Sequence, residues 1–322
     1  MSLTRRAGLL SALTALGAGL TGCSAPAVVT TQEGGGPTGA TASSDATGNA
    51  LTAADPLPTG AVNAIVCGTD SDRDNTNTDV LVLAQLSADR RQVTLVSVPR
   101  DCYVPIAGGP PRKVNAALAE QGVAALSRTV SDLFGGLTVH YVAQTNFADF
   151  VKLCAAFDGF SVTNRLASSV TSSVTGKVTT FPAGPLQLHG ADWLIYARQR
   201  HGLPNGDFDR GERHRAIVAG LVTRAQSVLA SGQAPFARLV RDACARVRLH
   251  GGLTAGNALG LAAALRAIEA GRLVSLRVPT SGGGPAGEYS DALSVDAARL
   301  GELAAGLRAG DVAAYVRAHG VG

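Results

Sequence analysis

Three groups of charged residues have types and spacings that suit the chemistry of phosphate esters. The first group is acidic: Asp70 ends one apolar, β-branched run and Asp79 begins the next. If these runs are neighbouring strands, the two carboxylates come together, and paired carboxylates with open positions suit a Mg²⁺ ion shared with a phosphate. An ordinary solvated Asp/Asn turn that ends two strands is the alternative, and it is favoured for this group taken alone.

The second group follows a β-branched run that leads into Pro99, Arg100 and Asp101, with Lys113 and Asn115 a little later. A strand that ends in this way projects its arginine at the edge of a sheet, where loops build sites. Arginine is the planar, permanently charged group that binds phosphate oxygens through two parallel hydrogen bonds. The alternative is a surface pair of Arg100 with Asp101 that contributes little to stability.

The third group surrounds the loop 202–206. Its members are Arg198 and Arg200 before the loop and Asp207, Arg210, Arg213 and His214 after it. Arg210 and Arg213 are three residues apart, so on a helix they are expected to face the same way. Two helix ends that both carry arginines beside one loop would form an anion clamp. A solvated helix stabilised by ion pairs, such as Asp209 with Arg213, is the alternative.

Taken together, the three groups predict a pyrophosphate site in which Mg²⁺ and arginines neutralise charge during phosphoryl transfer. The sequence contains no G-x-S-x-G, Walker A or zinc motif that would predict a different site. Residues 60–322 carry 26 basic and 21 acidic residues, a net charge of +5, and few aromatic residues. This excess is too small for a general nucleic-acid binder, which has a strong basic stripe interleaved with aromatics.

The elements that must position these groups alternate along the chain. Strands are predicted at 62–67, 79–86, 92–98, 138–144 and 274–278. Helices are predicted at 114–134 with a break at Gly122, from Asn146 onward, at 191–200, 213–229 and 236–248, and before about residue 270. Thr175-Gly176 is predicted to turn a polar hairpin. This alternation predicts an α/β fold with helices on both faces of a mixed β-sheet.

The N-terminal residues predict export. Arg5 and Arg6 precede a short apolar run, and Leu20-Thr21-Gly22-Cys23 resembles a bacterial lipobox, so 1–23 is predicted to be a signal peptide that leaves Cys23 lipidated. The alternative is a chance cysteine in an uncleaved anchor helix. Residues 24–59, rich in Ser, Thr, Gly and Ala, are predicted to be a flexible tether, and 60–322 a single domain. The expected location is extracytoplasmic, on the cell membrane through a lipid anchor.

Four further cysteines, Cys67, Cys102, Cys154 and Cys244, permit two disulfides in three pairings. The pair Cys154 and Cys244 is favoured because both fall on predicted helices, and four buried free thiols are the alternative.

The order of these motifs resembles the LytR-CpsA-Psr family. The resemblance covers about residue 60 to the C-terminus, and the motifs that carry it are Gly68-Thr69-Asp70, Thr78-Asp79-Val80, Ser97-Val98-Pro99-Arg100-Asp101, Lys113-Val114-Asn115, Tyr196-Ala197-Arg198-Gln199-Arg200 and Gly206-Asp207-Phe208-Asp209-Arg210 with Arg213. It implies an α/β/α sandwich around a central mixed sheet, with an apolar tunnel for a polyprenyl chain. It also implies transfer of a glycan phosphate from a polyprenyl-pyrophosphate carrier to peptidoglycan, with Mg²⁺ as cofactor.

By this resemblance, Asp70 and Asp79 hold the cation, and Arg100, Arg198, Arg200, Arg210 and Arg213 bind the pyrophosphate or the developing charge. Lys113 and Asn115 shape the edge of the same pocket. Asp101 and Asp207 are candidates for the general base that activates the hydroxyl of a muramoyl sugar.

The chain departs from the family pattern at two site positions. Asn77 stands where the family usually has arginine, and His214 where it usually has glutamine. The missing arginine supports a second hypothesis, a non-catalytic lipoprotein that binds polyprenyl-phosphate glycans as a carrier or accessory protein. The abundance of Ala, Gly, Arg and Val suggests a GC-rich actinobacterium, where arabinogalactan or a similar polymer is the expected glycan.

Overall fold

The computed structural model describes residues 57–69, 76–172, 175–252, 258–260, 264–268, 272–284 and 289–321. The predicted signal peptide with Cys23, the tether up to residue 56, and Asp70 lie outside the described residues. Near the predicted end of the tether, the Pro58 carbonyl oxygen accepts a 2.8 Å hydrogen bond from the Arg90 guanidinium. In the described part of the chain, no helix has the length and apolar character needed to cross a membrane.

A six-stranded mixed sheet forms the centre of the fold, in the order β11-β6-β1-β2-β3-β12. Its strands are β1 (Val62–Thr69), β2 (Thr78–Leu86), β3 (Val93–Ser97), β6 (Tyr141–Asn146), β11 (Arg248–His250) and β12 (Leu273–Arg277). β1 pairs in parallel with β6, and β3 in parallel with β12, whereas the other neighbours are antiparallel. The predicted mixed sheet is therefore confirmed.

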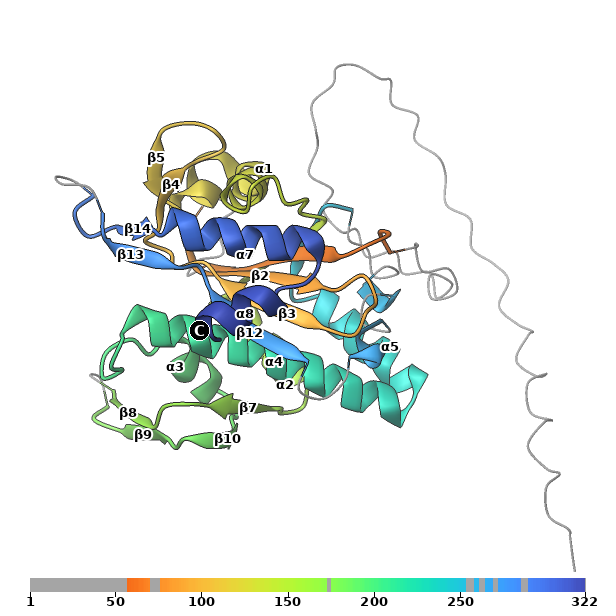
Figure 1. Ribbon diagram of the computed structural model, residues 1–322. Coiled ribbons are helices and arrows are strands. Elements are labelled where there is room, and N and C mark those ends of the chain that lie inside the picture. Colours follow the sequence, from red (N-terminus) through yellow and green to blue (C-terminus); the bar gives the residue numbers. More distant parts are fainter. Residues whose placement is uncertain are drawn as a thin grey trace, which may run out of the picture. The chain divides into compact units, whose positions relative to one another are not determined.

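Helices cover both faces of the sheet because alternate residues of its strands are apolar on both sides. On β2, Leu81 and Leu83 belong to one core cluster, and Val82 belongs to another. The first cluster is completed by α1 (Ala116–Leu133), α7 (Ala297–Ala309) and α8 (Ala313–His319). The second face is covered by α4 (Asp207–Ser231), through Val218 and Ala219. Figure 1 shows α7 and α4 on opposite sides of the sheet.

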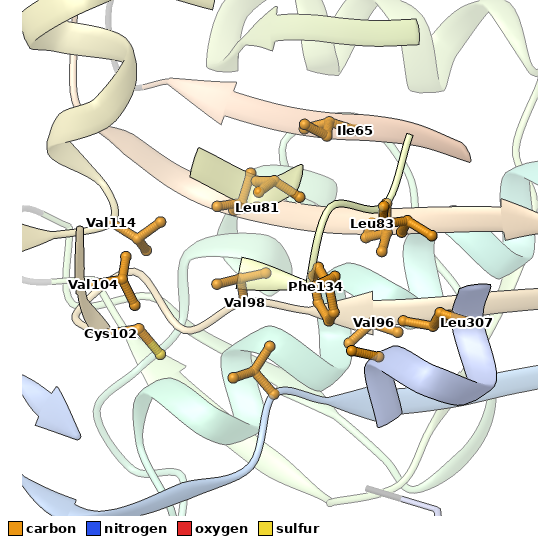
Figure 2. Packing of buried hydrophobic residues seen from close by; sticks show 14 of the residues in the cluster. Ile65, Leu81, Leu83, Val96, Val98, Cys102, Val104, Val114, Phe134 and Leu307 are labelled. Atoms are coloured by element: carbon orange, nitrogen blue, oxygen red, sulfur yellow. The ribbon is translucent and has the colours of Figure 1, made fainter. Parts of the chain in front are cut away.

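The larger core lies between the sheet and α1, α7 and α8. Figure 2 shows Leu81, Leu83 and Val96 of the sheet beside Leu307 of α7 and Phe134, the residue that follows α1. Several of these side chains are entirely buried, Val96 and Phe134 among them. Full burial of an aliphatic or aromatic side chain contributes about 1.5–3 kcal/mol, so this cluster is a main source of stability.

A second core supports the helices beneath the sheet. It joins the helices α2 (Phe147–Ala156), α3 (Asp192–Arg198) and α5 (Gln233–Cys244) with two small two-stranded sheets. One sheet pairs β7 (Ser161–Asn164) with β10 (Gly184–Gln187), and the other pairs β8 (Ser168–Thr171) with β9 (Val178–Phe181). The Phe160 and Trp193 rings stack at the centre of this core, with centroids 3.9 Å apart. The remaining described elements are β4 (Tyr103–Pro105), β5 (Pro111–Lys113), β13 (Thr280–Gly283), β14 (Leu293–Val295) and the 3₁₀ turn η1 (Leu265–Ala267).

Glycine and asparagine set helix boundaries where the sequence predicts them. Within α1, Gly122 has φ 76° and ψ −168°, which interrupts the helix at the predicted break. Gly135 and Gly136, both with positive φ, end it as predicted. Asn146 caps α2 by accepting a 2.8 Å hydrogen bond from the Asp149 backbone N–H.

Three details of the sequence-based prediction are wrong. The helix predicted at 236–248 ends at Cys244, and Arg248 begins β11. Helix α4 begins at Asp207 instead of residue 213, because Asp207 and Asp209 lie in its first turn, where acidic side chains favour the helix dipole. The favoured Cys154–Cys244 disulfide is absent, and all four of the cysteines described are free thiols. Both residues lie on helices as predicted, but Cys154 packs in the core around Trp193 and Cys244 in a separate cluster around Phe236.

Candidate functional site

The candidate site lies where two parallel strands end side by side. Ser97, the last residue of β3, is in register with Arg277, the last residue of β12. The carboxyl ends of parallel strands share one sheet edge, and ligands of open α/β sheets bind outside that edge. Val98 and Pro99 carry the chain from β3 to Arg100, while the first turns of α4 place Asp207, Phe208 and Arg210 against the same edge.

Backbone hydrogen bonds hold the acidic and basic groups in register. The Asn115 N–H donates to the Arg100 carbonyl oxygen, and the Asn115 carbonyl oxygen accepts from the Thr78 N–H, both at 3.1 Å. Asn115 therefore ties the start of β2, which carries Asp79, to the loop that carries Arg100. The Asn115 side chain makes no capping hydrogen bond, so this contribution comes from its backbone.

Five of the predicted residues form one chain of charges. Arg100 Nη1 lies 2.6 Å from Asp79 Oδ1, while its Nε lies 3.7 Å from Asp101 Oδ2 and 3.9 Å from Asp207 Oδ1. Asp207 Oδ1 is also 2.6 Å from Arg210 Nη2. Asp79, Arg100, Asp101 and Asp207 are each about a quarter exposed, whereas Arg210 is almost buried.

The cavity beside this chain is small and charged. It has a volume of about 20 Å³, room for about one water molecule. The depression around it encloses about 290 Å³ when the part open to solvent is included. Its lining includes the charged residues Arg100, Asp207, Arg210 and Arg277, and also His214. A phosphate group therefore fits the open depression more readily than the inner cavity.

Several buried polar atoms of the site have no hydrogen-bond partner in the described part of the chain. They are Arg100 Nε, Arg210 Nε, Arg210 Nη2 and Asp207 Oδ1. The short Asp207–Arg210 contact is therefore an ion pair without good hydrogen-bond geometry. Buried donors are almost always bonded in folded proteins, and leaving one unmade costs about 1–3 kcal/mol. Arg100 Nε and Arg210 Nε make no hydrogen bond, and Arg210 Nη2 has only the ion pair with Asp207, so these groups suit an acceptor that binds from outside the chain.

Burial also keeps His214 neutral. Burial, together with the nearby positive charge of Arg210, lowers the pKa of His214 to about 4. Nε2 lies 2.9 Å from the Ala197 carbonyl oxygen, which assigns the proton to Nε2. Burial, with Arg100 and Arg200 nearby, likewise lowers the pKa of Arg210 against the opposing effect of Asp207.

Lys113 stands at the rim of the site on β5. Its Nζ lies 2.6 Å from Asp291 Oδ2 and 3.3 Å from Asp101 Oδ1. The Asp291 carboxylate, together with Asp101, raises the pKa of Lys113. The lysine therefore connects the Arg100 loop to the segment before β14.

The third predicted group is not brought together completely. Arg198 is exposed at the end of α3 with its Cζ 4.5 Å from the Phe147 ring centroid, and Arg200 is exposed but close enough to influence the charge of Arg210. Arg213 points to a different place, where it donates 2.6 Å hydrogen bonds to Gln199 Oε1 and Ser168 Oγ. The suggested Asp209–Arg213 ion pair does not form among the described residues, since Asp209 instead accepts two bonds from Asn205.

The predicted metal site is only partly described. Asp70 lies outside the described residues. Asp79 binds Arg100 through Oδ1, while its Oδ2 accepts no hydrogen bond from the described residues. Within that same set, no cluster of three or more His, Cys, Asp or Glu residues could hold a metal ion. Asp79 therefore offers one carboxylate oxygen of the kind that Mg²⁺ prefers.

Three residues of the site have no role assigned in the sequence-based prediction. Arg215 is 2 % exposed, donates to Ser97 Oγ, and donates to Ser275 Oγ at 2.7 Å, so it fixes α4 against β3 and β12. Phe208 and Arg277 line the cavity. One signal was available: Arg277-Val278-Pro279 has the same Val-Pro step that follows Ser97, at the end of another predicted strand.

The fold is a mixed α/β sheet with helices on both faces, and the buried arginines at its carboxyl edge are groups that could bind an anion. The sequence profile of the LytR_cpsA_psr family matches residues 30–304, and the chain belongs to this family.

The curated relatives include the cell wall biosynthesis protein LcpA of Corynebacterium glutamicum, 35% identical over 187 residues that make up 50% of this chain and 35% of LcpA. Another is the polyisoprenyl-teichoic acid–peptidoglycan teichoic acid transferase TagU of Enterococcus faecalis, 35% identical over 162 residues that cover 50% of this chain and 51% of TagU. The matched region thus spans about half or less of the length of these relatives.

Solved structures share the fold. TagV of B. subtilis has a TM-score of 0.66 at 21% identity, covering 79% of this chain and 98% of TagV. TagT of B. subtilis has a TM-score of 0.62 at 21% identity, covering 81% and 95% of the two chains. At this identity the likeness establishes the α/β architecture.

Proposed function

We propose that this protein is a Mg²⁺-dependent phosphotransferase of the cell envelope that moves a glycan phosphate from a polyprenyl-pyrophosphate carrier to peptidoglycan. The observation that carries the proposal is the set of buried, unpaired N–H groups of Arg100 and Arg210 at the edge of the sheet. The diphosphate of such a carrier presents the acceptor oxygens that these donors lack. TagU and LcpA, which are named for teichoic acid transfer to peptidoglycan and for cell wall biosynthesis, support the same reaction class.

In this reaction Arg100 and Arg210 bind the diphosphate oxygens and stabilise the charge that develops as the bond breaks. A sugar hydroxyl of peptidoglycan attacks the phosphorus nearest the glycan, and polyprenyl phosphate leaves with the electron pair of the broken P–O bond. Asp101 and Asp207, both within 4 Å of Arg100, are the candidates to accept the hydroxyl proton. Lys113 and Asn115 hold the Arg100 loop in place.

Asp79 and Asp70 are the residues that we expect to hold Mg²⁺, through carboxylate oxygens. When bound, the ion neutralises phosphate charge. Binding at Asp79 Oδ2 is compatible with the Arg100 contact, because that contact uses Oδ1. Arg200 contributes positive charge beside Arg210. The predicted signal peptide and lipidated Cys23 would place the domain outside the membrane.

A non-catalytic carrier or accessory lipoprotein is the second candidate, favoured by one observation. Asn77, where the family usually has arginine, is exposed and neutral at the start of β2. One fewer charge-assisted contact costs about 2–3 kcal/mol of transition-state stabilisation, which corresponds to some hundredfold in rate.

Release of inorganic phosphate from geranylgeranyl pyrophosphate tests the proposal. We expect Mg²⁺-dependent release by the purified chain, with losses of about a hundredfold or more in Arg100→Ala and Asp79→Ala. Arg317→Ala, which removes an exposed arginine on α8, is the matched control and should retain full activity. Tight binding of the lipid without release would favour the carrier. Neither binding nor release would contradict both candidates.

A further inference from the structure

Arg277 occupies a position in the site that the family motifs leave unassigned. It ends β12 beside the end of β3, and its guanidinium Cζ lies 3.9 Å from the centroid of the Phe208 ring on the first turn of α4. Arg277 and Phe208 line the same cavity as Arg100 and Arg210. The cavity therefore has guanidinium groups from three separate elements of the chain.

The three guanidinium groups differ in whether a carboxylate lies close enough to pair with them. Arg100 and Arg210 each have a carboxylate oxygen at 2.6 Å. Arg277 has neither a hydrogen bond nor an ion pair within 4.0 Å to any residue that the structure describes, although it is only partly exposed. Burial lowers the pKa of Arg277, and Asp209 opposes this from beyond ion-pair distance. Both carboxylate oxygens of Asp209 accept hydrogen bonds from Asn205.

Arg277 is therefore the one arginine of the three that has no carboxylate within ion-pair distance among the described residues. Burial disfavours such a charge, whereas a bound anion would stabilise it. The contact with Phe208 places the guanidinium over the face of an aromatic ring, and the N–H groups of Arg277 make no hydrogen bond to the described residues. The ring also restrains the side chain, so less conformational freedom is lost when a ligand binds.

We propose that Arg277, held over the Phe208 ring, is a phosphate-contact residue of this site that donates to oxygens of a diphosphate ligand alongside Arg100 and Arg210. This inference rests on the proposed function and extends its phosphate-binding surface from β3 and α4 to β12. A purely structural role would require only the stacking contact, which a neutral side chain of similar length can partly retain.

Calorimetric titration of the full chain with geranylgeranyl diphosphate tests the proposal. We expect Arg277→Gln to raise Kd by about tenfold to a hundredfold, the effect of losing a charge-assisted hydrogen bond. Arg277→Lys keeps the charge but loses the planar fork, so its Kd should lie between those of Arg277→Gln and the wild type. Phe208→Leu should raise Kd by only a fewfold. Arg317→Gln, with the same change of charge on the exposed part of α8, should bind like the wild type.

Inorganic diphosphate as a second probe separates the headgroup from the lipid chain. A phosphate contact predicts a similar loss for both probes in Arg277→Gln. A loss seen only with the lipid probe would overturn the proposal, because Arg277 would then act on the chain.

The outcomes also separate this inference from the function on which it rests. Wild-type binding in Arg277→Gln, with binding lost in Arg210→Gln, would overturn the role of Arg277 and leave the proposed function standing. An equal loss of affinity in Arg277→Gln and Arg317→Gln would mean that the net charge of the protein, and not a direct contact, determines binding, and it would overturn the proposed contact. Failure of the wild type to bind either probe would overturn both. Thermal melting identifies variants that do not fold, and if Arg277→Gln is among them, Arg277→Lys decides by the same comparison.

Discussion

Burial places two kinds of side chain in unusual states at this site. His214 is 7 % exposed and neutral, and Arg210, 8 % exposed, has N–H groups without acceptors. Both lie on α4 about one turn apart, and the positive charge of Arg210 adds to the effect of burial in lowering the pKa of His214. This part of α4 therefore favours an acceptor atom of a ligand near Arg210 and disfavours a proton on His214.

The neutral state of His214 makes stability depend on pH. Its folded-state pKa of about 4 lies below the ordinary 6.5, so the unfolded chain binds a proton first as the pH falls. This group's contribution is fully present above pH 6.5 and is lost progressively between pH 6.5 and 4. From pH 7.5 to 5 we expect the free energy of unfolding to fall by about 2 kcal/mol on account of His214.

His214→Gln should remove that part of the pH dependence, because glutamine does not titrate and can still donate to the Ala197 carbonyl oxygen. Urea unfolding of both proteins at pH 7.5 and 5 measures the difference. An identical pH dependence in the two proteins would contradict the neutral, buried state assigned to His214.

Arg210 and Arg213 should respond to substitution in opposite ways. Arg210→Gln should weaken diphosphate binding at least tenfold with little effect on folding, because Arg210 has unmet donors at the cavity. Arg213→Gln should lower the free energy of unfolding by about 2–3 kcal/mol and leave Kd within about threefold, because Arg213 bonds Gln199 and Ser168. Calorimetric titration and urea unfolding of each variant test this. Equal losses of binding in both would contradict the division.

The sequence pattern could not separate these two arginines. Residues three apart on a helix differ by about 60° around its axis, which permits a shared face but does not require one. Here that angle is enough to direct Arg210 to the cavity and Arg213 to the β8 and α3 side. The position of Arg100, by contrast, was predictable, because a Pro-Arg-Asp sequence that follows an apolar strand lies at the edge of the sheet.

At the scale of elements, α4 connects the site to the rest of the fold. Its first turn carries Asp207 and Arg210, Arg215 ties it to β3 and β12, and further along it passes β7 closely at Gly220. A Cβ atom at Gly220 would lie 2.7 Å from both Phe160 Cδ2 and the Ser161 carbonyl oxygen. Close approach of α4 to β7 therefore requires glycine at this position.

Gly220→Ala should destabilise the protein by about 1–3 kcal/mol, because overpacking against the backbone outweighs the better helix propensity of alanine. Gly301→Ala on α7 is the matched control, since nothing lies within 4 Å of its added Cβ, and it should be neutral or stabilising by up to about 1 kcal/mol. Thermal or urea unfolding gives both values. Equal stability changes in the two variants would contradict the packing of α4.

The sequence predicts elements well where local chemistry determines them. The strands at 62–67, 79–86 and 274–278 and the break at Gly122 are confirmed, because β-branched runs and a positive-φ glycine have few alternatives. The start of α4 was missed because Arg210, Arg213, His214 and Arg215 are buried polar residues, which hide the apolar periodicity on which helix prediction depends. The prediction of the Cys154–Cys244 disulfide failed because pairing depends on the distance and direction between two side chains on different helices.

At the scale of the whole molecule, the site exists only when distant segments meet. Asp79, Arg100, Asp207 and Arg277 come from β2, the loop after β3, α4 and β12, which are separated by up to about two hundred residues of sequence. The charges that repel one another at this edge are held together by the sheet and by the cores on both of its faces. In the proposed function, the arginines assembled in this way bind the diphosphate of the carrier.

Transfer of labelled glycan phosphate to peptidoglycan fragments is the most direct test of the central claim. The purified chain is incubated with a polyprenyl-diphosphate-linked glycan, peptidoglycan fragments and Mg²⁺, and the label on the fragments and the polyprenyl phosphate released are measured together. We expect the two products to form in equal amounts, and both to fall by about a hundredfold or more in Arg100→Ala but not in Arg317→Ala. Binding of the lipid-linked glycan without either product, or unchanged transfer in Arg100→Ala, would contradict the account.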